Sequence, residues 1–251
     1  MILNARGSNG DMVVIIESDK EAAGARELDP ATLARIDVAS APEILSWTAE
    51  WFPEGSIALS SAFGPGSAVL IHMLSEIAPR TPVIFVDTLH HFAETLAHAE
   101  MVTERYGLDL RVFRAAPDRS TFEAEHGERL WEKDLERYQL LTKVEAFKVA
   151  TAPLAGWITG RRRDQSSSRT ELPVVEVRDK IRINPLAAWT RQEIWEFIRA
   201  HDLPYNPLHD RGYPSVGDEP LTTPVSPDED ERSGRWRGTD QLECGIHIPT
   251  L

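Results

Sequence analysis

The sequence predicts an α/β fold of the doubly wound type, in which helices cover both faces of a mostly parallel sheet. Short apolar runs at residues 56–62, 81–87, 110–114 and 156–159 alternate with helical patterns. These runs are apolar along most of their length, which is typical of strands buried on both faces of a parallel sheet. The shares of hydrophobic (41%) and charged (27%) residues are ordinary for a globular protein and exclude a largely disordered or fibrous chain.

Helices are predicted before, between and after these strands. Apolar side chains recur at helical spacing in each segment, and the predicted helices cover residues 41–52, 67–78, 92–106, 121–150 and 190–201. The last of them begins with a capping box, in which Thr190 is the N-cap and Glu193 stands three residues later. A shorter helix is predicted near residues 30–36.

The composition divides the chain into three parts. Residues 1–40 are rich in Gly, Ala, Asp and Glu, and we interpret them as a loosely ordered leader. Residues 41–210 hold the alternating strands and helices and form the α/β domain. Residues 211–251 are rich in Pro and Gly, and we expect a mobile C-terminal tail that carries the single cysteine, Cys244.

The charge balance limits the partners of the protein. With 27 basic and 40 acidic residues the net charge is −13, so nucleic acids and anionic membranes are not expected partners. No apolar run approaches the roughly 18 residues that a transmembrane helix needs. The N-terminal residues lack the basic start and apolar stretch of a signal peptide, and we expect a cytoplasmic protein.

A turn between the first strand and its helix is rich in small residues. It reads Ser60-Ser61-Ala62-Phe63-Gly64-Pro65-Gly66-Ser67. The N–H groups at a helix start favour an anion, although glycines in a tight turn equally serve its geometry. Asp87 and Thr88 end the next strand, at the edge of a parallel sheet where ligands bind. Asp87 alone is also explained as a cap of the following helix.

The fourth strand is followed by a basic loop, Gly160-Arg161-Arg162-Arg163-Asp164-Gln165-Ser166-Ser167-Ser168-Arg169. Guanidinium groups and hydroxyls bind phosphate or sulfate oxygens well. A charged run is often only a solvated surface loop. This loop lies in line with the two motifs above, at the same predicted edge of the sheet, which favours a site for an oxyanion.

Cys244 stands in the segment Glu243-Cys244-Gly245-Ile246-His247. A thiol in a Gly- and Pro-rich tail has no core to fill and is accessible as a nucleophile, and His247 is close enough to assist it. A single cysteine cannot form an internal disulfide, and it excludes a four-thiolate metal or iron–sulfur site within one chain.

Together these motifs resemble the phosphoadenylyl-sulfate and adenylyl-sulfate reductase family. The likeness runs from about residue 56 to residue 247, and ECGIH is similar to the family's ECGLH signature. The resemblance implies a fold like that of the adenine nucleotide α-hydrolases and reduction of a sulfonucleotide to sulfite. It makes Cys244 the nucleophile, and it implies a nucleotide site formed by Ser60, Ser61, Phe63, Gly64, Gly66, Ser67, Asp87, Thr88, Lys143, Gly160, Arg161, Arg162, Arg163, Gln165, Arg169, Arg235 and His247.

The sequence departs from the family pattern at two kinds of position. Leu89 stands where the family's DTG motif has its glycine. The adenylyl-sulfate branch carries paired cysteines that bind an iron–sulfur cluster, and the corresponding positions here are Tyr138, Gln139, Asp218 and Leu221. The resemblance therefore implies an enzyme of the cluster-free type, with no bound cofactor and no metal.

The proposed chemistry needs an external reductant. Attack of the Cys244 thiolate on the sulfate sulfur leaves a Cys–S–SO₃⁻ adduct, and the chain holds no second thiol to resolve it. The expected electron donor is reduced thioredoxin or glutaredoxin, and we also expect a homodimer. Phosphoadenylyl sulfate is the favoured substrate, with adenylyl sulfate as the alternative. An ATP pyrophosphatase of the same fold and a non-enzymatic nucleotide-binding regulator are more distant alternatives.

Overall fold

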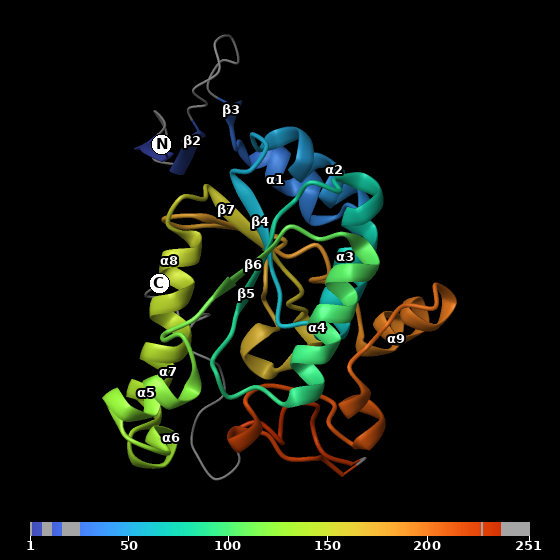
Figure 1. The fold of residues 1–251 in the computed structure, drawn as a ribbon. Helices are drawn as coiled ribbons and strands as arrows, with labels where there is room; N and C mark the ends of the chain where they lie inside the picture. Colours follow the sequence, from blue (N-terminus) through green and yellow to red (C-terminus); the bar gives the residue numbers. More distant parts are fainter. Residues whose placement is uncertain (1, 7–11, 17–25, 227, 237–251) are drawn as a thin grey trace.

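A six-stranded sheet forms the centre of the computed structural model, which describes residues 2–6, 12–16, 26–226 and 228–236 (Figure 1). The strand order is β6-β5-β4-β7-β9-β8. The pairs from β6 to β9 are parallel, and β8 pairs antiparallel to β9 at the edge. The strands are β4 (Ile57–Ser60), β5 (Val83–Val86), β6 (Leu110–Phe113), β7 (Gly156–Thr159), β8 (Val175–Val177) and β9 (Ile181–Ile183).

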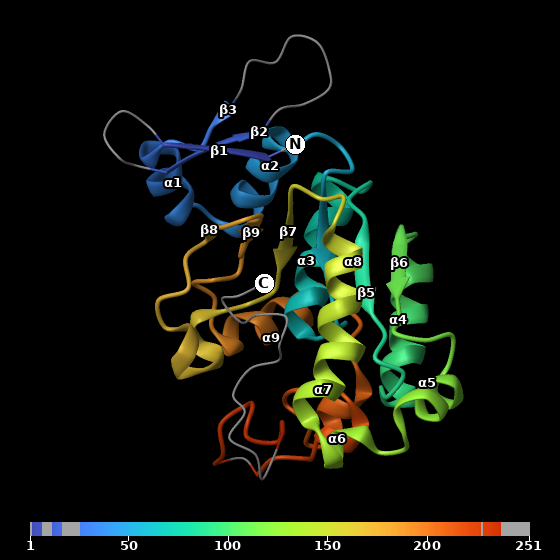
Figure 2. The same ribbon diagram turned by 90° about the vertical axis from the view of Figure 1, so that its left-hand side faces the viewer.

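Helices cover both faces of this sheet, as the sequence predicts (Figures 1 and 2). Alternate side chains of β4 show the two layers, because Ile57 and Leu59 join the main apolar core whereas Ala58 packs with Ala150 and Leu154 near α8. The main core is built with α1 (Pro30–Asp37), α2 (Ala41–Trp51), α3 (Pro65–Ile77), α4 (Ala93–Tyr106) and α9 (Arg191–Ala200). The predicted capping box of α9 is present.

The helical region predicted over residues 121–150 is not one helix. It consists of α5 (Arg119–His126), α6 (Leu130–Lys133), α7 (Leu135–Gln139), a π-helical turn (Leu140–Glu145) and α8 (Ala146–Thr151). Gly127 and Arg129 have positive φ angles, and Asp134 starts a new helix by accepting a hydrogen bond from the N–H of Arg137. These local turns interrupt a pattern that is otherwise helical in its apolar spacing.

Two segments contain structure beyond what the sequence predicted. The expected leader includes a three-stranded antiparallel sheet of β1 (Ile2–Arg6), β2 (Met12–Ile16) and β3 (Arg26–Glu27). Within the expected tail, Asp218, Thr222 and Trp236 are buried. The domain boundaries at residues 40 and 210 stay predictions, but buried residues continue to Trp236. Among the described residues, none of the helices combines the length and the apolar character needed to cross a bilayer.

Candidate active site

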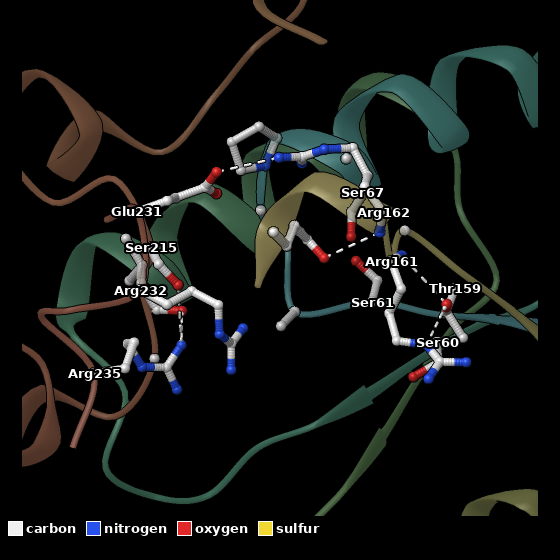
Figure 3. Close-up of a pocket in the computed structure, with 18 of the residues that line it drawn as sticks. Ser60, Ser61, Ser67, Thr159, Arg161, Arg162, Ser215, Glu231, Arg232 and Arg235 are labelled. Atoms are coloured by element: carbon white, nitrogen blue, oxygen red, sulfur yellow. Dashed lines mark hydrogen bonds and ion pairs between the residues drawn. The ribbon is translucent and has the colours of Figure 1, made fainter. Parts of the chain in front are cut away.

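A cavity of about 250 Å³ opens at the edge of the sheet where the parallel strands end. Residues that follow β4, β5 and β7 form one side of it, and residues 214–236 form the other (Figure 3). The turn of small residues, Thr88 and the arginine loop therefore meet at one place, as the sequence predicts. Figure 3 shows Arg232 and Arg235, from the C-terminal segment, across the cavity from Ser60, Ser61 and Ser67.

Two glycines allow the small-residue turn and the arginine loop to lie backbone against backbone. A Cβ atom on Gly66 would stand 3.0 Å from the carbonyl oxygen of Gly160, and one on Gly160 would stand 3.2 Å from the carbonyl carbon of Gly66. Both distances are shorter than ordinary carbon contacts, so a side chain at either position would push the loops apart. This contact keeps the N-terminus of α3 beside the arginines.

Two residues with positive φ angles shape the turns at the cavity. Phe63 (φ 55°) is buried and packs edge-on against Phe85, while its N–H donates to Ser61 Oγ at 3.0 Å. Leu89 (φ 67°) adopts the left-handed conformation that glycine favours, and its N–H donates to Asp87 Oδ1 at 2.9 Å. A positive φ angle costs energy in a non-glycine residue, and such conformations are concentrated at functional sites.

Three arginines of the loop, Arg161, Arg162 and Arg169, are buried, and carboxylates hold the first two. Arg161 forms an ion pair with Glu176 of β8, and its Nε donates to Thr159 Oγ1 at 3.3 Å. The side chain of Arg162 is 3% exposed, and it contacts Asp164 at 2.8 Å and Glu231 at 3.1 Å. Since these partners come from three separate segments, the arginines have little freedom to change their position.

The cavity wall also contains a buried ion pair between Lys143, which the resemblance assigned to the site, and Asp218, which it did not. Lys143 Nζ lies 2.7 Å from Asp218 Oδ2. The hydroxyl of Thr88 donates to Asp218 Oδ1 at 2.8 Å, and that of Tyr138 donates to Oδ2 at 3.1 Å. Burial is the largest single influence and would raise the pKa of Asp218, but the Lys143 ammonium together with His91 and Arg235 outweighs it, so the pKa lies well below its ordinary value.

The cavity is cationic although the chain is acidic. Among the described residues that line it, six carry positive charge and two are carboxylates, Asp218 and Glu231. The cations are Lys143, Arg161, Arg162, Arg169, Arg232 and Arg235. A site with this excess attracts an anion with several charged oxygens. The described residues include no group of three or more His, Cys, Asp or Glu placed to hold a metal ion.

Comparison with known proteins fits this geometry. The family described as "Phosphoadenosine phosphosulfate reductase domain" matches residues 56–224. The chain belongs to this family. A phosphoadenosine 5'-phosphosulfate reductase of Xylella fastidiosa (strain M12) is 42% identical over 218 residues, which cover 84% of this chain and 91% of the relative.

Two further relatives of this reductase family are informative. An adenosine 5'-phosphosulfate reductase of Chelativorans sp. (strain BNC1) is 43% identical over 199 residues, which cover 79% of this chain and 81% of that protein. The crystal structure of a phosphoadenylyl-sulfate reductase from Candida auris, a phosphate complex, superposes with a TM-score of 0.71 at 32% identity. The match covers 80% of this chain and all of that one, which confirms the predicted fold.

Most of the residues expected in the nucleotide site of a family member line the cavity. They are Ser60, Ser61, Gly64, Gly66, Ser67, Thr88, Lys143, Gly160, Arg161, Arg162, Gln165, Arg169 and Arg235. Three expected residues do not line it. Phe63 packs into the core, Asp87 forms an ion pair with Arg114 at 2.7 Å, and Arg163 donates to the carbonyl oxygen of Leu172 at 2.8 Å. Cys244 and His247 lie outside the described residues.

The structure adds lining residues that the motifs did not single out. Among them are Thr159 at the end of β7, His91 in the loop after β5, and Ser215, Gly217, Asp218, Glu231, Arg232 and Trp236 from the C-terminal segment. Sequence reasoning assigned only Arg235 of that segment to the site, because the contribution of the other residues depends on long-range packing. The charge of Arg232 and its place one turn before Arg235 were the available signals.

Lys143→Met is expected to make folding stability depend on pH in a new way. In the native protein the lowered pKa of Asp218 stabilises the fold above the unfolded value of about 3.9, and this contribution is lost as the pH falls toward the folded pKa. Without the ammonium, burial raises the pKa of Asp218, so the penalty is largest at neutral pH and shrinks toward pH 4. We expect a loss of about 3–5 kcal/mol in unfolding free energy at pH 7.

Urea unfolding at pH 7 and pH 4.5 measures this effect. The control is Lys148→Met, which removes an exposed lysine of α8 and is expected to change the unfolding free energy equally little at both values. A loss for Lys143→Met that is as large at pH 4.5 as at pH 7 would contradict the role assigned to its ion pair.

Proposed function

We propose that this protein reduces 3'-phosphoadenylyl sulfate to sulfite and adenosine 3',5'-bisphosphate in sulfate assimilation. The observation that carries the proposal is the cationic cavity, which the arginine loop and the N-terminus of α3 form at the carboxyl edge of the sheet. A sulfonucleotide offers sulfonyl and phosphate oxygens to these donors. The names of the relatives support the same activity.

The reaction requires one nucleophile and one external dithiol. The Cys244 thiolate attacks the sulfate sulfur, forming an S–S bond while the bond from sulfur to the bridging phosphate oxygen breaks. The nucleotide leaves with its phosphate, and the cations of the cavity stabilise the charge that develops on it. A thiolate of the dithiol then attacks Cys244 Sγ and expels sulfite, and its second thiol resolves the mixed disulfide and regenerates Cys244.

Cys244 has to reach the cavity for this chemistry. Trp236 lines the cavity, and Cys244 follows eight residues later, a stretch that spans at most about 28 Å when extended. We propose that residues 237–251 bring the thiol to the nucleotide and then to the dithiol protein. Thioredoxin or glutaredoxin as donor, a homodimer, a cytoplasmic location and the role of His247 stay predictions.

A comparison of kcat/KM for the two sulfonucleotides tests the proposed substrate. Adenylyl sulfate is the alternative, because a relative named for it is 43% identical. We expect sulfite from both nucleotides with reduced thioredoxin, and a kcat/KM at least about 10-fold higher for 3'-phosphoadenylyl sulfate, since one lost phosphate contact is worth roughly 1.5–3 kcal/mol. The reverse preference supports the alternative. Absence of sulfite with either nucleotide, and with both thioredoxin and glutaredoxin, rules out the reductase.

Cys244→Ser is expected to abolish sulfite formation while nucleotide binding stays within about 3-fold, because a serine hydroxyl is a far weaker nucleophile than a thiolate at neutral pH. Intact-mass spectrometry of the native protein mixed with substrate alone is expected to show a gain of about 80 Da on Cys244. Reduced thioredoxin should remove that mass. Turnover by the serine variant would show that Cys244 is not the nucleophile.

Arg162→Ala is expected to weaken binding of adenosine 3',5'-bisphosphate by about 1.5–3 kcal/mol, or roughly 10- to 150-fold in Kd. Arg163→Ala is the matched control, because its side chain contacts Leu172 and Asp37 outside the cavity. Isothermal titration calorimetry gives both values of Kd. Equal losses in the two variants would assign the arginine loop a structural role only.

A further inference from the structure

Asp218 has an unusual position for a carboxylate in a cationic site. It is 1% exposed, and it accepts from the Thr88 hydroxyl at 2.8 Å and the Tyr138 hydroxyl at 3.1 Å, beside the Lys143 ammonium at 2.7 Å. These three groups come from the end of β5, from α7 and from the π-helical turn. Asp218 itself belongs to the C-terminal segment, and α7 runs directly into the π-helical turn, so three separate parts of the chain meet at one side chain.

A purely structural explanation accounts poorly for this arrangement. A buried ion pair rarely stabilises a fold more than apolar side chains of the same volume would. Tyr138 and Leu221 already pack in an apolar cluster with Phe122 and Leu130, so the polar pair is not needed to fill the space. Lys143 and Asp218 both line the cavity instead. The pair therefore lies where a ligand can use it.

The contacts of Asp218 fix the ammonium of Lys143. A lysine side chain has four rotatable bonds and loses rotamer entropy when it is held in place. One of its three donors is directed to Asp218, which leaves the ammonium at the cavity wall with further donors. Moreover, the π-helical turn that carries Lys143 is a type of local distortion often found at functional sites.

We infer that Asp218 is a positioning residue for the reduction: it holds the Lys143 ammonium where negative charge develops on the phosphate of the leaving nucleotide. This inference rests on the proposed function. Asp218 reaches Lys143 only when the C-terminal segment lies beside Thr88 and Tyr138, as the hydrogen bonds of Asp218 to both show. The lysine is therefore oriented only when the segment that leads to Cys244 is in place, which links completion of the site to docking of that segment.

Lys143 is proposed to stabilise negative charge on the leaving phosphate, and this determines which kinetic constants change in the variants. The phosphate gains charge in the transition state and carries it fully in the released bisphosphate. In Asp218→Asn and in Lys143→Met we expect kcat to fall roughly 10- to 100-fold, as for the partners of other active-site groups, with KM for the sulfonucleotide within about 3-fold. The Kd of adenosine 3',5'-bisphosphate should rise about 10-fold in both variants, in line with the lost charge contact.

The decisive measurement is a double-mutant cycle of kcat with Asp218→Asn, Lys143→Met and both together. If Asp218 acts through Lys143, the double variant is no slower than Lys143→Met alone, within about 3-fold. Losses that multiply would overturn the inference and make Asp218 a structural residue. Glu94→Gln is the control, since Glu94 pairs with Arg211 at 2.6 Å outside the cavity and should leave kcat unchanged.

Two further readouts cover the remaining outcomes. Should Asp218→Asn fail to fold, Tyr138→Phe keeps the charge and removes only the 3.1 Å hydrogen bond, and a fall of about 3- to 10-fold in kcat at constant KM is expected. A kcat within 2-fold of the native value would overturn the inference. Should the native protein make no sulfite, the proposed function fails by itself, and the cycle measured on bisphosphate Kd still decides whether Asp218 acts through Lys143.

Discussion

Three buried cations at the carboxyl edge of the sheet need anionic partners, and much of the structure around the site follows from that need. Arg161 is paired with Glu176 of β8, Arg162 with Glu231, and Lys143 with Asp218. Because leaving a buried charge unpaired is costly, each carboxylate fixes the segment that supplies it. The pairs that hold β8 and residues 211–236 in place thus also keep positive charge at the cavity.

Two strained backbone positions at the same edge are stabilised by apolar packing. Phe63 and Leu89 both have positive φ angles, at the turns that follow β4 and β5. Their side chains provide compensation, since Phe63 is buried against Phe85 and Leu89 packs against the cluster of Phe122, Leu130 and Tyr138. Leu89, at the position of the family's glycine, thus adopts a left-handed conformation that glycine would adopt at lower cost, and its apolar contacts offset that cost.

The sequence predicted the parts of the fold that depend on local signals. Apolar runs identified β4, β5, β6 and β7, and their order in an α/β chain brought the Ser60–Ser67 turn, Thr88 and the arginine loop to one edge. It did not predict β8 and β9, because Glu176 and Arg182 make these three-residue strands appear polar. Both are buried: Glu176 pairs with Arg161, and the Arg182 guanidinium lies 5.1 Å from the ring of Trp157. Asp218 was not assigned to the site either, because its partners Thr88, Tyr138 and Lys143 are far away in the sequence.

The positions that resemble cluster-binding cysteines show how two segments are joined here without thiolates. Tyr138 and Asp218 are hydrogen-bonded to each other, and Leu221 packs against the apolar cluster that contains Tyr138. A metal cluster would hold these segments by covalent ligation, whereas this chain holds them by a buried carboxylate with three polar partners and an adjacent apolar contact. The carboxylate of Asp218 also pairs with the Lys143 ammonium at 2.7 Å. The same residue that joins the C-terminal segment to the sheet can therefore set the position of a charge at the site, and assembly of the fold and assembly of the site depend on one side chain.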